Sequence, residues 1–438
     1  MLHFGTDGIR GVAFSDLTET FATAVGAACT RVLSISDIVI GRDTRQSGHR
    51  LETAFASGCA MAGARVHLLG IAPTPAVANL AAENGWAGSS ITASHNEYLD
   101  NGIKIFAAGG LKLMSAQEHA IESELLAGIN NIVAPKSFIS HDATEMIRSY
   151  EQSIIDLVPA EAFSGMHIVL DCANGAMVDV APEVFARCGA TVTTINCEPN
   201  GRNINANCGA THPDAVSQAV RLHQSDFGLA FDGDGDRVVA VDHLGNIVDG
   251  DHLIALAARD LKWSSQLAKN TVVVTEMTNI GFHRAMNDAG IHVVTTAVGD
   301  RCVLAELDAH GYVLGGEQSG HIIYRAHATT GDGLLAGVML ADFVRRANQP
   351  LFELATDAMT SFPQVLVNVK ITQRGVDVGS LFAEELHEAQ IHLGGSGRVL
   401  LRTSGTEPVV RVMVEAESDI HAREIADRLA TVVAQRLG

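Results

Sequence analysis

Ile38-Val39-Ile40-Gly41-Arg42-Asp43 is an apolar run that ends in a polar turn, and the same outline returns at residues 168–171 and 272–275. A helical stretch closed by a glycine follows each run, and further apolar runs start at residues 62–66, 188–192 and 289–293. The order strand, loop, helix, glycine, strand predicts a βαβ unit with a right-handed crossover. Continuous β-branched runs indicate strands buried on both faces. We therefore expect three related α/β domains.

The C-terminal part of the chain has a different pattern. Runs at residues 365–369, 397–402 and 409–415 read as strands in hairpin order, and an amphipathic helix is predicted at about 420–437. Strands in this order with a helix indicate a small α+β domain. The fold class is therefore α/β, with three similar domains that contain βαβ units in mixed sheets, plus a smaller fourth domain. The predicted domains are residues 1–155, 156–255, 256–365 and 366–438.

The composition and net charge of the chain limit the classes of function that it can have. Of the 438 residues, 47% are hydrophobic and 18% are charged, which provides large cores. The net charge of −20 argues against nucleic acid as a partner and requires local cations to capture an anionic substrate. The sequence shows neither a membrane-spanning run nor an N-terminal signal, so we expect a cytoplasmic protein without a membrane partner.

Ser94 lies in the polar turn Thr92-Ala93-Ser94-His95-Asn96, directly after an apolar run. A serine at a strand end presents its hydroxyl to a cleft and becomes a nucleophile when a base, a metal or a positive field activates it. A turn or helix-capping serine is the alternative. Lys104 follows in a second turn and offers a cation that neutralises phosphate or donates a proton. The Gly-x-Ser-x-Gly pattern of serine hydrolases is absent around Ser94.

Three aspartates alternate with glycines at residues 232–236, directly after an apolar run. Three carboxylates so close together repel each other unless a cation neutralises them. Hard oxygen ligands favour Mg²⁺, so Asp232, Asp234 and Asp236 are predicted metal ligands. An EF-hand is excluded because Arg237 stands where that loop needs glycine. A solvated acidic turn is the alternative.

A third loop, Gly315-Gly316-Glu317-Gln318-Ser319-Gly320-His321, follows another apolar run. Glu317 and Ser319 offer hydrogen bonds to vicinal sugar hydroxyls. His321 offers an acid or base near neutral pH, although a lone histidine is more often structural.

A fourth loop carries an anion-binding pattern. Arg402 precedes Ser404-Gly405-Thr406, and backbone N–H groups, hydroxyls and a guanidinium together form a phosphate nest. Arg411 on the following strand adds a second cation. Arg10 in the N-terminal loop is either a second charge clamp or part of an N-terminal turn. An ordinary hairpin turn is the alternative. Gly-Lys occurs nowhere in the chain, which excludes a Walker loop. The four loops together favour phosphoryl transfer to a sugar from a donor carried on the protein.

With these loops in this order, the chain resembles the α-D-phosphohexomutase superfamily over essentially its whole length. The resemblance implies four domains around a central cleft and an isomerase that moves a phosphoryl group within a sugar. It implies that Ser94 is a phosphoserine and that Asp232, Asp234 and Asp236, with the serine phosphate, bind one Mg²⁺ per active site. It further implies sugar-hydroxyl contacts at Glu317 and Ser319.

The resemblance also assigns roles to the basic residues and the fourth loop. The non-reacting phosphate is implied to bind Arg402, Ser404, Gly405 and Thr406, and Arg411 stays a candidate from the sequence alone. Four basic residues match positions near the reacting groups, namely Arg10, Lys104, Arg237 and His321. One departure is Glu97, where the serine loop of this family usually has proline.

Details at residues 4–11, 298–301, 318 and 329–333 are similar to members that act on an amino-sugar phosphate. The implied reaction interconverts glucosamine 6-phosphate and glucosamine 1-phosphate through glucosamine 1,6-bisphosphate. Its product feeds the synthesis of UDP-N-acetylglucosamine and cell-wall precursors. A mutase for glucose or mannose phosphates is the nearest alternative, and a catalytically silent sugar-phosphate-binding protein or a metal-dependent phosphatase are alternatives of other classes. A homodimer is left open.

Overall fold

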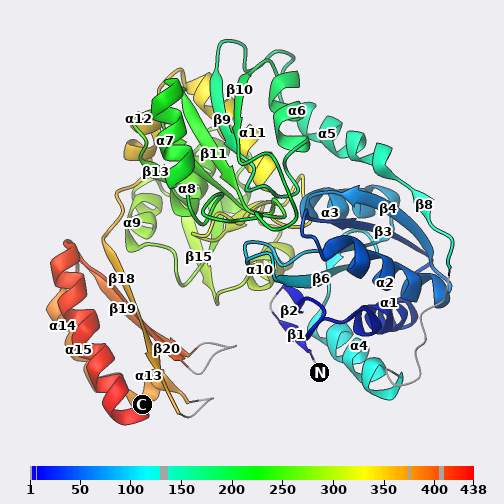
Figure 1. Ribbon diagram of the computed structural model, residues 1–438. Helices are drawn as coiled ribbons and strands as arrows, with labels where there is room; N and C mark the ends of the chain where they lie inside the picture. Colours follow the sequence, from blue (N-terminus) through cyan, green and yellow to red (C-terminus); the bar gives the residue numbers. More distant parts are fainter. Residues whose placement is uncertain (1, 6, 129–136, 373–375, 404–408) are drawn as a thin grey trace. The chain divides into compact units, whose positions relative to one another are not determined.

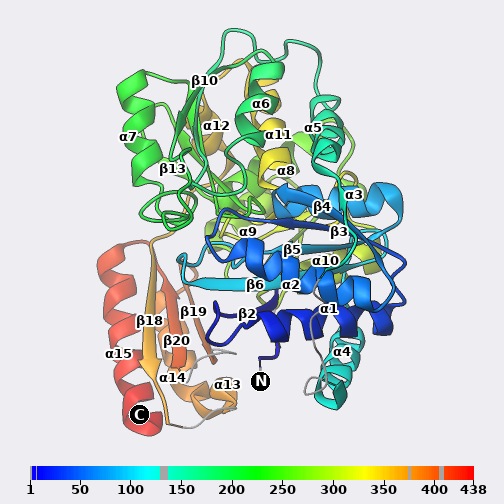
Figure 2. The ribbon, with the colours of Figure 1, turned by 45° about the vertical axis from the view of Figure 1, so that its right-hand side comes forward.

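The computed structural model describes residues 2–5, 7–128, 137–372, 376–403 and 409–438. The chain forms two compact units, the first from Met1–Met277 with Gly290–Ala358, and the second from Thr278–Ala289 with Met359–Gly438. Figures 1 and 2 show their elements. Within the described ranges, no helix combines the length and apolar character that crossing a membrane requires.

The first unit begins with an eight-stranded sheet in the order β1-β2-β6-β5-β3-β4-β8, with β7 paired to β6. Its strands are β1 (Phe4–Gly5), β2 (Gly8–Val12), β3 (Asp37–Arg42), β4 (Arg65–Ile71), β5 (Ala87–Ile91), β6 (Asp100–Ala107), β7 (Leu111–Lys112) and β8 (His141–Asp142). The accompanying helices are α1 (Glu19–Leu33), α2 (Gly48–Met61), α3 (Thr74–Asn84), α4 (Ser115–Gly128), the short 3₁₀ turn η2 (Thr144–Met146) and α5 (Ile147–Ile155). Helices α1 and α2 pack side by side (Figures 1 and 2).

Two smaller sheets complete the first unit, in the orders β10-β9-β11-β12-β13 and β15-β14-β16-β17. The strands of the five-stranded sheet are β9 (His167–Asp171), β10 (Thr191–Ile195), β11 (Phe227–Phe231), β12 (Val238–Asp242) and β13 (Ile247–Val248), with helices α6 (Val180–Arg187) and α7 (Asp214–His223). The other sheet consists of β14 (Thr271–Thr275), β15 (His292–Thr296), β16 (Leu314–Gly316) and β17 (Ile322–Tyr324). Its helical elements are α8 (Gly250–Trp263), the 3₁₀ turn η3 (Ala268–Asn270), α10 (Asp300–His310), α11 (Gly333–Ala347) and α12 (Leu351–Ala358).

The three predicted repeats are confirmed. In each repeat the two predicted strands pair in parallel, as β3 with β4, β9 with β10, and β14 with β15. The glycines predicted to stop the helices, Gly63, Gly189 and Gly290, have φ angles of 102°, 94° and 63°, which favour glycine. The first strand of each repeat is buried throughout its apolar run, as expected for strands covered on both faces.

The second unit has the predicted α+β character. Its antiparallel sheet has the order β18-β20-β19, from β18 (Gln364–Lys370), β19 (Arg398–Thr403) and β20 (Val409–Glu415). Its helices are α9 (Ile280–Asp288), α13 (Val378–Leu381), α14 (Ala383–Leu393) and α15 (Asp419–Leu437), and α15 packs on β18 and β20. Helix α9 joins this unit because the Ile280 N–H donates to Glu415 Oε2 at 3.0 Å. The predicted domain boundaries stay a prediction.

Candidate active site

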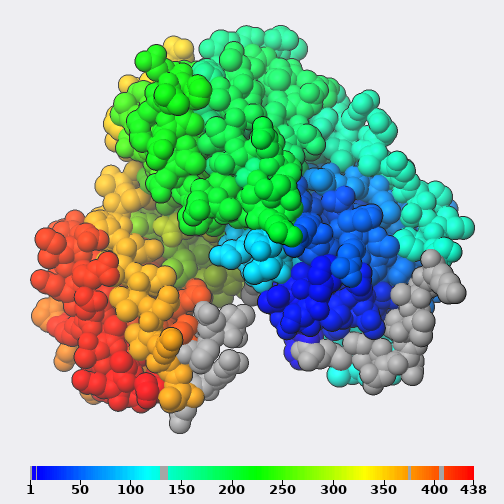
Figure 3. All heavy atoms as spheres, in the orientation of Figure 1, coloured from blue at the N-terminus to red at the C-terminus, as the bar shows by residue number. Residues whose placement is uncertain are grey.

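The functional loops of the first unit follow the carboxyl ends of strands. Parallel strands β3 and β5 pair Arg42 with Ile91, so Asp43 and Thr92 emerge together. The Thr92 hydroxyl donates to Asp43 Oδ2 at 2.7 Å. The aspartate loop, residues 232–236, likewise follows β11. The loop predicted to bind sugar hydroxyls, residues 317–321 and called the sugar-hydroxyl loop below, follows β16. Ligands of α/β sheets bind at this end of the strands. In the space-filling view the blue and green segments of the first unit lie against each other (Figure 3).

Ser94 is fully buried and holds a left-handed backbone conformation, with φ of 52°. Its hydroxyl donates to Asp232 Oδ2 at 2.6 Å, which joins the serine loop to the aspartate loop. Gly233 makes this approach possible, since a Cβ there would lie 2.6 Å from the Ser94 carbonyl oxygen. The His95 Nδ1 lies 3.3 Å from the serine hydroxyl, and burial, with help from nearby Arg237, lowers the pKa of His95 to about 4. His95 is therefore neutral at physiological pH.

Asp232, Asp234 and Asp236 form a candidate metal site, because one carboxylate oxygen from each lies within 4.8 Å of the others. All three side chains are buried. Burial raises the pKa of Asp232, and repulsion by Asp236 and Asp234 raises it further. Asp234 Oδ1 is buried and accepts no hydrogen bond from the described residues. An oxygen left in this state fits a cation ligand.

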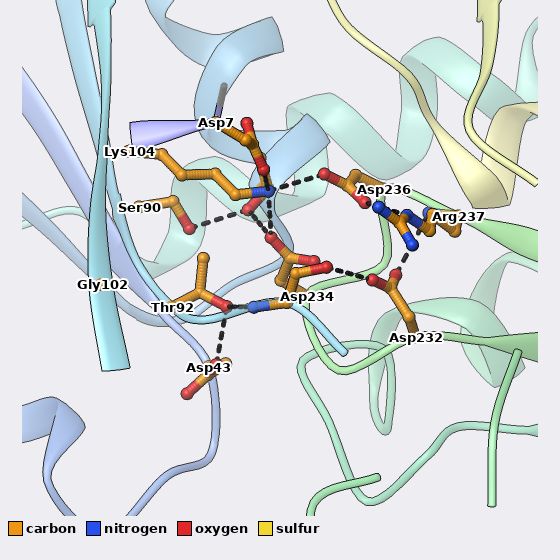
Figure 4. A network of polar contacts seen from close by, with 12 residues as sticks. Asp7, Asp43, Ser90, Thr92, Gly102, Lys104, Asp232, Asp234, Asp236 and Arg237 are labelled. Atoms are coloured by element: carbon orange, nitrogen blue, oxygen red, sulfur yellow. Dashed lines mark hydrogen bonds and ion pairs between the residues drawn. The ribbon is translucent and has the colours of Figure 1, made fainter. Parts of the chain in front are cut away.

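Lys104, on β6, lies among three carboxylates (Figure 4). Its Nζ is 2.7 Å from Asp7 Oδ2, 2.8 Å from Asp234 Oδ2 and 2.6 Å from Asp236 Oδ2. Burial opposes charge on this amine, but the carboxylates, with Asp234 first, outweigh burial and raise the pKa of Lys104 well above its usual value. The side chain is therefore a permanent buried cation beside the aspartates.

Two arginines flank the same carboxylates. The Arg237 backbone N–H donates to Asp232 Oδ1 at 3.1 Å, and its side-chain Nε lies 3.9 Å from Asp236 Oδ1. Burial lowers the pKa of Arg237, but Asp236 and Asp232 reverse this effect and keep the guanidinium charged. Arg10, on β2, donates to Asp7 Oδ2 at 2.9 Å.

His321 is buried between two acidic groups of the first unit. Its Nδ1 lies 3.7 Å from Asp236 Oδ1, and its Nε2 lies 3.5 Å from Asp300 Oδ2. Burial lowers the pKa of His321, but Asp236 and Asp300 outweigh burial and raise it above its ordinary value. The structure therefore brings His321 into the charged cluster, where its Nε2 also accepts the Gly331 N–H at 3.1 Å.

The sugar-hydroxyl loop lies at the edge of this cluster. Glu317 Oε1 accepts a hydrogen bond from the Gly299 N–H at 2.9 Å. Ser319 is exposed, and Glu317 is half-buried, so both remain accessible to a ligand. The Gly250 N–H donates to the Gln318 carbonyl at 3.1 Å and holds the loop against α8.

The predicted phosphate-binding residues belong to the second unit. Arg402 on β19 is paired directly with Arg411 on β20, and both are half-buried. The structure therefore brings these two cations together. Ser404, Gly405 and Thr406 lie outside the described residues, so their prediction is untested.

Several residues of the cluster were missed by the sequence reasoning. Asp7 and Lys112 pair at 2.8 Å, and Lys112 also pairs with Asp300, which faces His321. Asp7 and Asp300 lie within stretches that the resemblance singled out, 4–11 and 298–301, so the sequence did contain a signal that could have identified these two residues. Lys112 and Arg45, a buried arginine beside the serine loop, stand in no recognisable motif.

Comparison with known families covers nearly the whole chain. Four models describe phosphoglucomutase/phosphomannomutase domains, namely alpha/beta/alpha domain I at residues 1–131, domain II at 146–245, domain III at 249–362 and the C-terminal domain at 366–432. A phosphoglucosamine mutase from Frankia casuarinae is 47% identical, across 98% of this chain and 97% of the relative. The chain belongs to the α-D-phosphohexomutase superfamily. Within this superfamily it groups with the phosphoglucosamine mutases.

Another curated relative and two solved structures are also similar to this phosphohexomutase over nearly its whole length. A phosphoglucosamine mutase from Exiguobacterium sp. is 44% identical, with 100% of this chain and 99% of the relative covered. A phosphoglucomutase/phosphomannomutase family protein from Burkholderia thailandensis has a similar fold, with a TM-score of 0.81, 23% identity, and 98% and 97% of the two chains covered. An Aspergillus fumigatus N-acetylphosphoglucosamine mutase, solved with GlcNAc-6P and magnesium, has a TM-score of 0.69 at 18% identity, with 99% and 96% covered. As a phosphohexomutase the chain is an isomerase.

Proposed function

We propose that this phosphohexomutase interconverts glucosamine 6-phosphate and glucosamine 1-phosphate through a phosphorylated Ser94. The observation that carries the proposal is the buried Ser94 hydroxyl, which donates to Asp232 at 2.6 Å within a cluster of three aspartates and Lys104. Relatives that are 43–47% identical over nearly the whole chain are named phosphoglucosamine mutases, which supports the choice of sugar.

The reaction conserves phosphate between enzyme and sugar. The O–P bond of phosphorylated Ser94 breaks as a bond forms to the free hydroxyl of glucosamine 6-phosphate, and the proton of that hydroxyl ends on the Ser94 oxygen. The product is glucosamine 1,6-bisphosphate, which then turns over in the site. Its other phosphoryl group returns to the Ser94 oxygen, the Ser94 proton ends on the sugar oxygen that is released, and glucosamine 1-phosphate is left.

The carboxylate cluster fits one Mg²⁺, since its three buried aspartates offer hard oxygen ligands and Asp234 Oδ1 accepts no hydrogen bond from the described residues. When bound, Mg²⁺ supplies neutralisation of the charge on the transferring phosphoryl group. Asp232, Asp234 and Asp236 would hold it, together with the serine phosphate.

The basic residues have electrostatic and proton-holding roles. Because its pKa is raised, Lys104 keeps its proton at neutral pH and stabilises negative charge beside Ser94. Arg237 and Arg10 add fixed positive charge next to the same carboxylates. His321 holds a proton at Nδ1, which faces Asp236, because its Nε2 accepts the Gly331 N–H at 3.1 Å, and it can share that proton with the reacting oxygens.

The remaining site residues bind the unreactive parts of the sugar phosphate. Glu317 and Ser319 accept and donate hydrogen bonds to vicinal hydroxyls, which discriminates epimers. Arg402 and Arg411 neutralise the phosphate that is not being transferred, together with Ser404, Gly405 and Thr406. One set of residues thus orients the sugar phosphate, and the other set carries out the phosphoryl transfer.

A ³¹P NMR assay tests the sugar. The protein is given Mg²⁺, a trace of hexose bisphosphate, and glucosamine, glucose or mannose 6-phosphate in separate tubes. We expect the fastest conversion with glucosamine 6-phosphate. Faster conversion of glucose or mannose 6-phosphate would instead make the chain a phosphoglucomutase or phosphomannomutase, and absence of conversion with all three would contradict mutase activity.

A further inference from the structure

Arg45 brings a complete positive charge into the interior of the first unit, where 2% of the residue remains exposed. It lies between β3 and α2, and it contacts the serine loop instead of solvent or a phosphate-binding element. Burial of an ion is unfavourable unless every donor finds an acceptor. The hydrogen-bond partners of Arg45 therefore indicate its role.

All five N–H donors of the Arg45 guanidinium have acceptors. Its Nε donates to Asp43 Oδ2 at 2.8 Å. The other four bonds go to backbone carbonyls of the serine loop, at Ser94 (3.0 Å), Asn96 (2.8 Å), Glu97 and Asp100 (3.0 Å). A lysine has three donors in a different geometry and cannot replace this set.

Asp43 connects the guanidinium to the strand that precedes Ser94. The Asp43 carboxylate accepts from Arg45 Nε and from the Thr92 hydroxyl at 2.7 Å. That hydroxyl in turn accepts the Ser94 N–H at 2.9 Å. The serine is thus held at its amide and at its carbonyl by one buried ion pair.

Asn205 holds the same loop from a different part of the first unit. Its Nδ2 donates to the carbonyls of Ser94 at 2.9 Å and Asn96 at 3.0 Å, the same two that receive one arm of Arg45. Asn205 is 8% exposed and lies in the segment between β10 and α7, beside the aspartate loop. Two carbonyls are therefore each held by donors from two segments that are distant in sequence.

The loop needs such support because its own sequence does not restrict it. Residues 95–99 contain no proline, and Ser94 has a φ of 52° that a non-glycine residue rarely adopts. Without the donors, four loop carbonyls beside a nucleophile would have to find other partners.

We propose that Arg45 and Asn205 are positioning residues that hold the Ser94 loop in the conformation required for phosphoryl transfer. This inference rests on the proposed function. Neither side chain needs to touch the sugar, so their loss should lower kcat and leave KM nearly unchanged. A displacement of about 1 Å at a nucleophile costs about 100-fold in rate.

The first test replaces Arg45 by lysine, with Arg50→Lys as the matched control because Arg50 is exposed, pairs with Glu19 and lies over the Phe14 ring, away from the Ser94 loop. We expect Arg45→Lys to lower kcat about 100-fold, with KM within about threefold of wild type and a shifted or broadened ³¹P signal of phosphorylated Ser94. Arg50→Lys should match wild type. A wild-type kcat in folded Arg45→Lys would overturn the inference. Inactivity of the wild-type protein on every sugar phosphate would instead contradict the proposed function.

Chemical rescue separates positioning from general stability. Addition of guanidinium chloride at low millimolar concentration to Arg45→Ala should restore kcat at least tenfold, whereas urea at equal concentration should not. If neither Arg45 variant folds, Asn205→Asp tests the same inference. This variant replaces the amide donor by a carboxylate of the same size, which cannot donate to the two carbonyls. We expect it to lower kcat about 10–100-fold at constant KM, with Asn207→Asp as control, because Asn207 is exposed and has a left-handed backbone conformation like that of Asn205. An unchanged kcat in Asn205→Asp would overturn the inference.

Discussion

Lys104 and Arg402 are both cations that the proposed reaction needs, yet their surroundings in the two units differ. Lys104 is 3% exposed and lies within 2.8 Å of three carboxylates. Arg402 is half-buried and is paired across the sheet with another arginine, Arg411. The first cation thus belongs to a preassembled network with carboxylates, whereas the second lies directly opposite another cation, in the pair that we propose to bind phosphate.

The largest effect should follow from removal of the nucleophile in the buried network. Ser94→Ala should lower kcat by about 10⁴-fold or more because the phosphoryl group loses its carrier. Calorimetric binding of glucosamine 6-phosphate should persist, since the arginine pair is unchanged. Normal turnover in this variant would reject the phosphoserine mechanism.

Removal of a predicted metal ligand tests the same network at a second point. Asp234→Asn should lower the Mg²⁺-dependent kcat by about 10²–10³-fold, because it removes a hard anionic donor and one charge that holds Lys104. The activity should be measured over a range of Mg²⁺ concentrations. Exposed Asp226→Asn is the control. Undiminished activity at every Mg²⁺ concentration would reject the site.

The arginine pair should respond mainly in substrate binding. Arg402→Ala and Arg411→Ala should each raise KM about 10–100-fold, the loss expected for a charge-assisted hydrogen bond to phosphate. Exposed Arg428→Ala in α15 is the control. A KM equal to that of wild type in both variants would remove the pair from the site.

The smallest effect concerns Asp332, a buried carboxylate that forms no ion pair with any described residue. Asp332 accepts hydrogen bonds from the Tyr150 hydroxyl at 3.1 Å and the Leu335 N–H at 2.9 Å, and burial raises its pKa to about 6. The folded protein therefore binds a proton more tightly than the unfolded chain, and its free energy of unfolding falls as pH rises from about 4 to 6. The penalty above pH 6 is at most about 3 kcal/mol.

Asp332→Asn keeps the helix cap but cannot ionise. The difference in unfolding free energy between variant and wild type should therefore grow from about pH 4 to 6 and stay level above it. Chemical denaturation at a series of pH values measures this difference. A difference that does not vary with pH would show that the carboxyl of Asp332 does not carry the raised pKa.

The elements and loops of the first unit were largely predictable because their signals are local. Apolar runs located β3, β9 and β14, and the polar stretches after strands located Ser94, the aspartates and His321. Arg45 and Lys112 were not predictable, since their partners lie about 50 to 190 positions away in the sequence and depend on strand pairing. The sequence identified Arg402 and Arg411 as cations of the site. That they lie directly opposite each other follows from the β19–β20 register, which the sequence did not show.

Mass spectrometry of a single turnover tests the central claim most directly. Protein phosphorylated by hexose bisphosphate is freed of small molecules and mixed with glucosamine 6-phosphate and Mg²⁺. The account predicts that the phosphoryl group is mapped to Ser94 and is lost from the protein as an equal amount of glucosamine 1,6-bisphosphate forms. Release of inorganic phosphate in place of the bisphosphate, or a phosphoryl group on another residue, would contradict it.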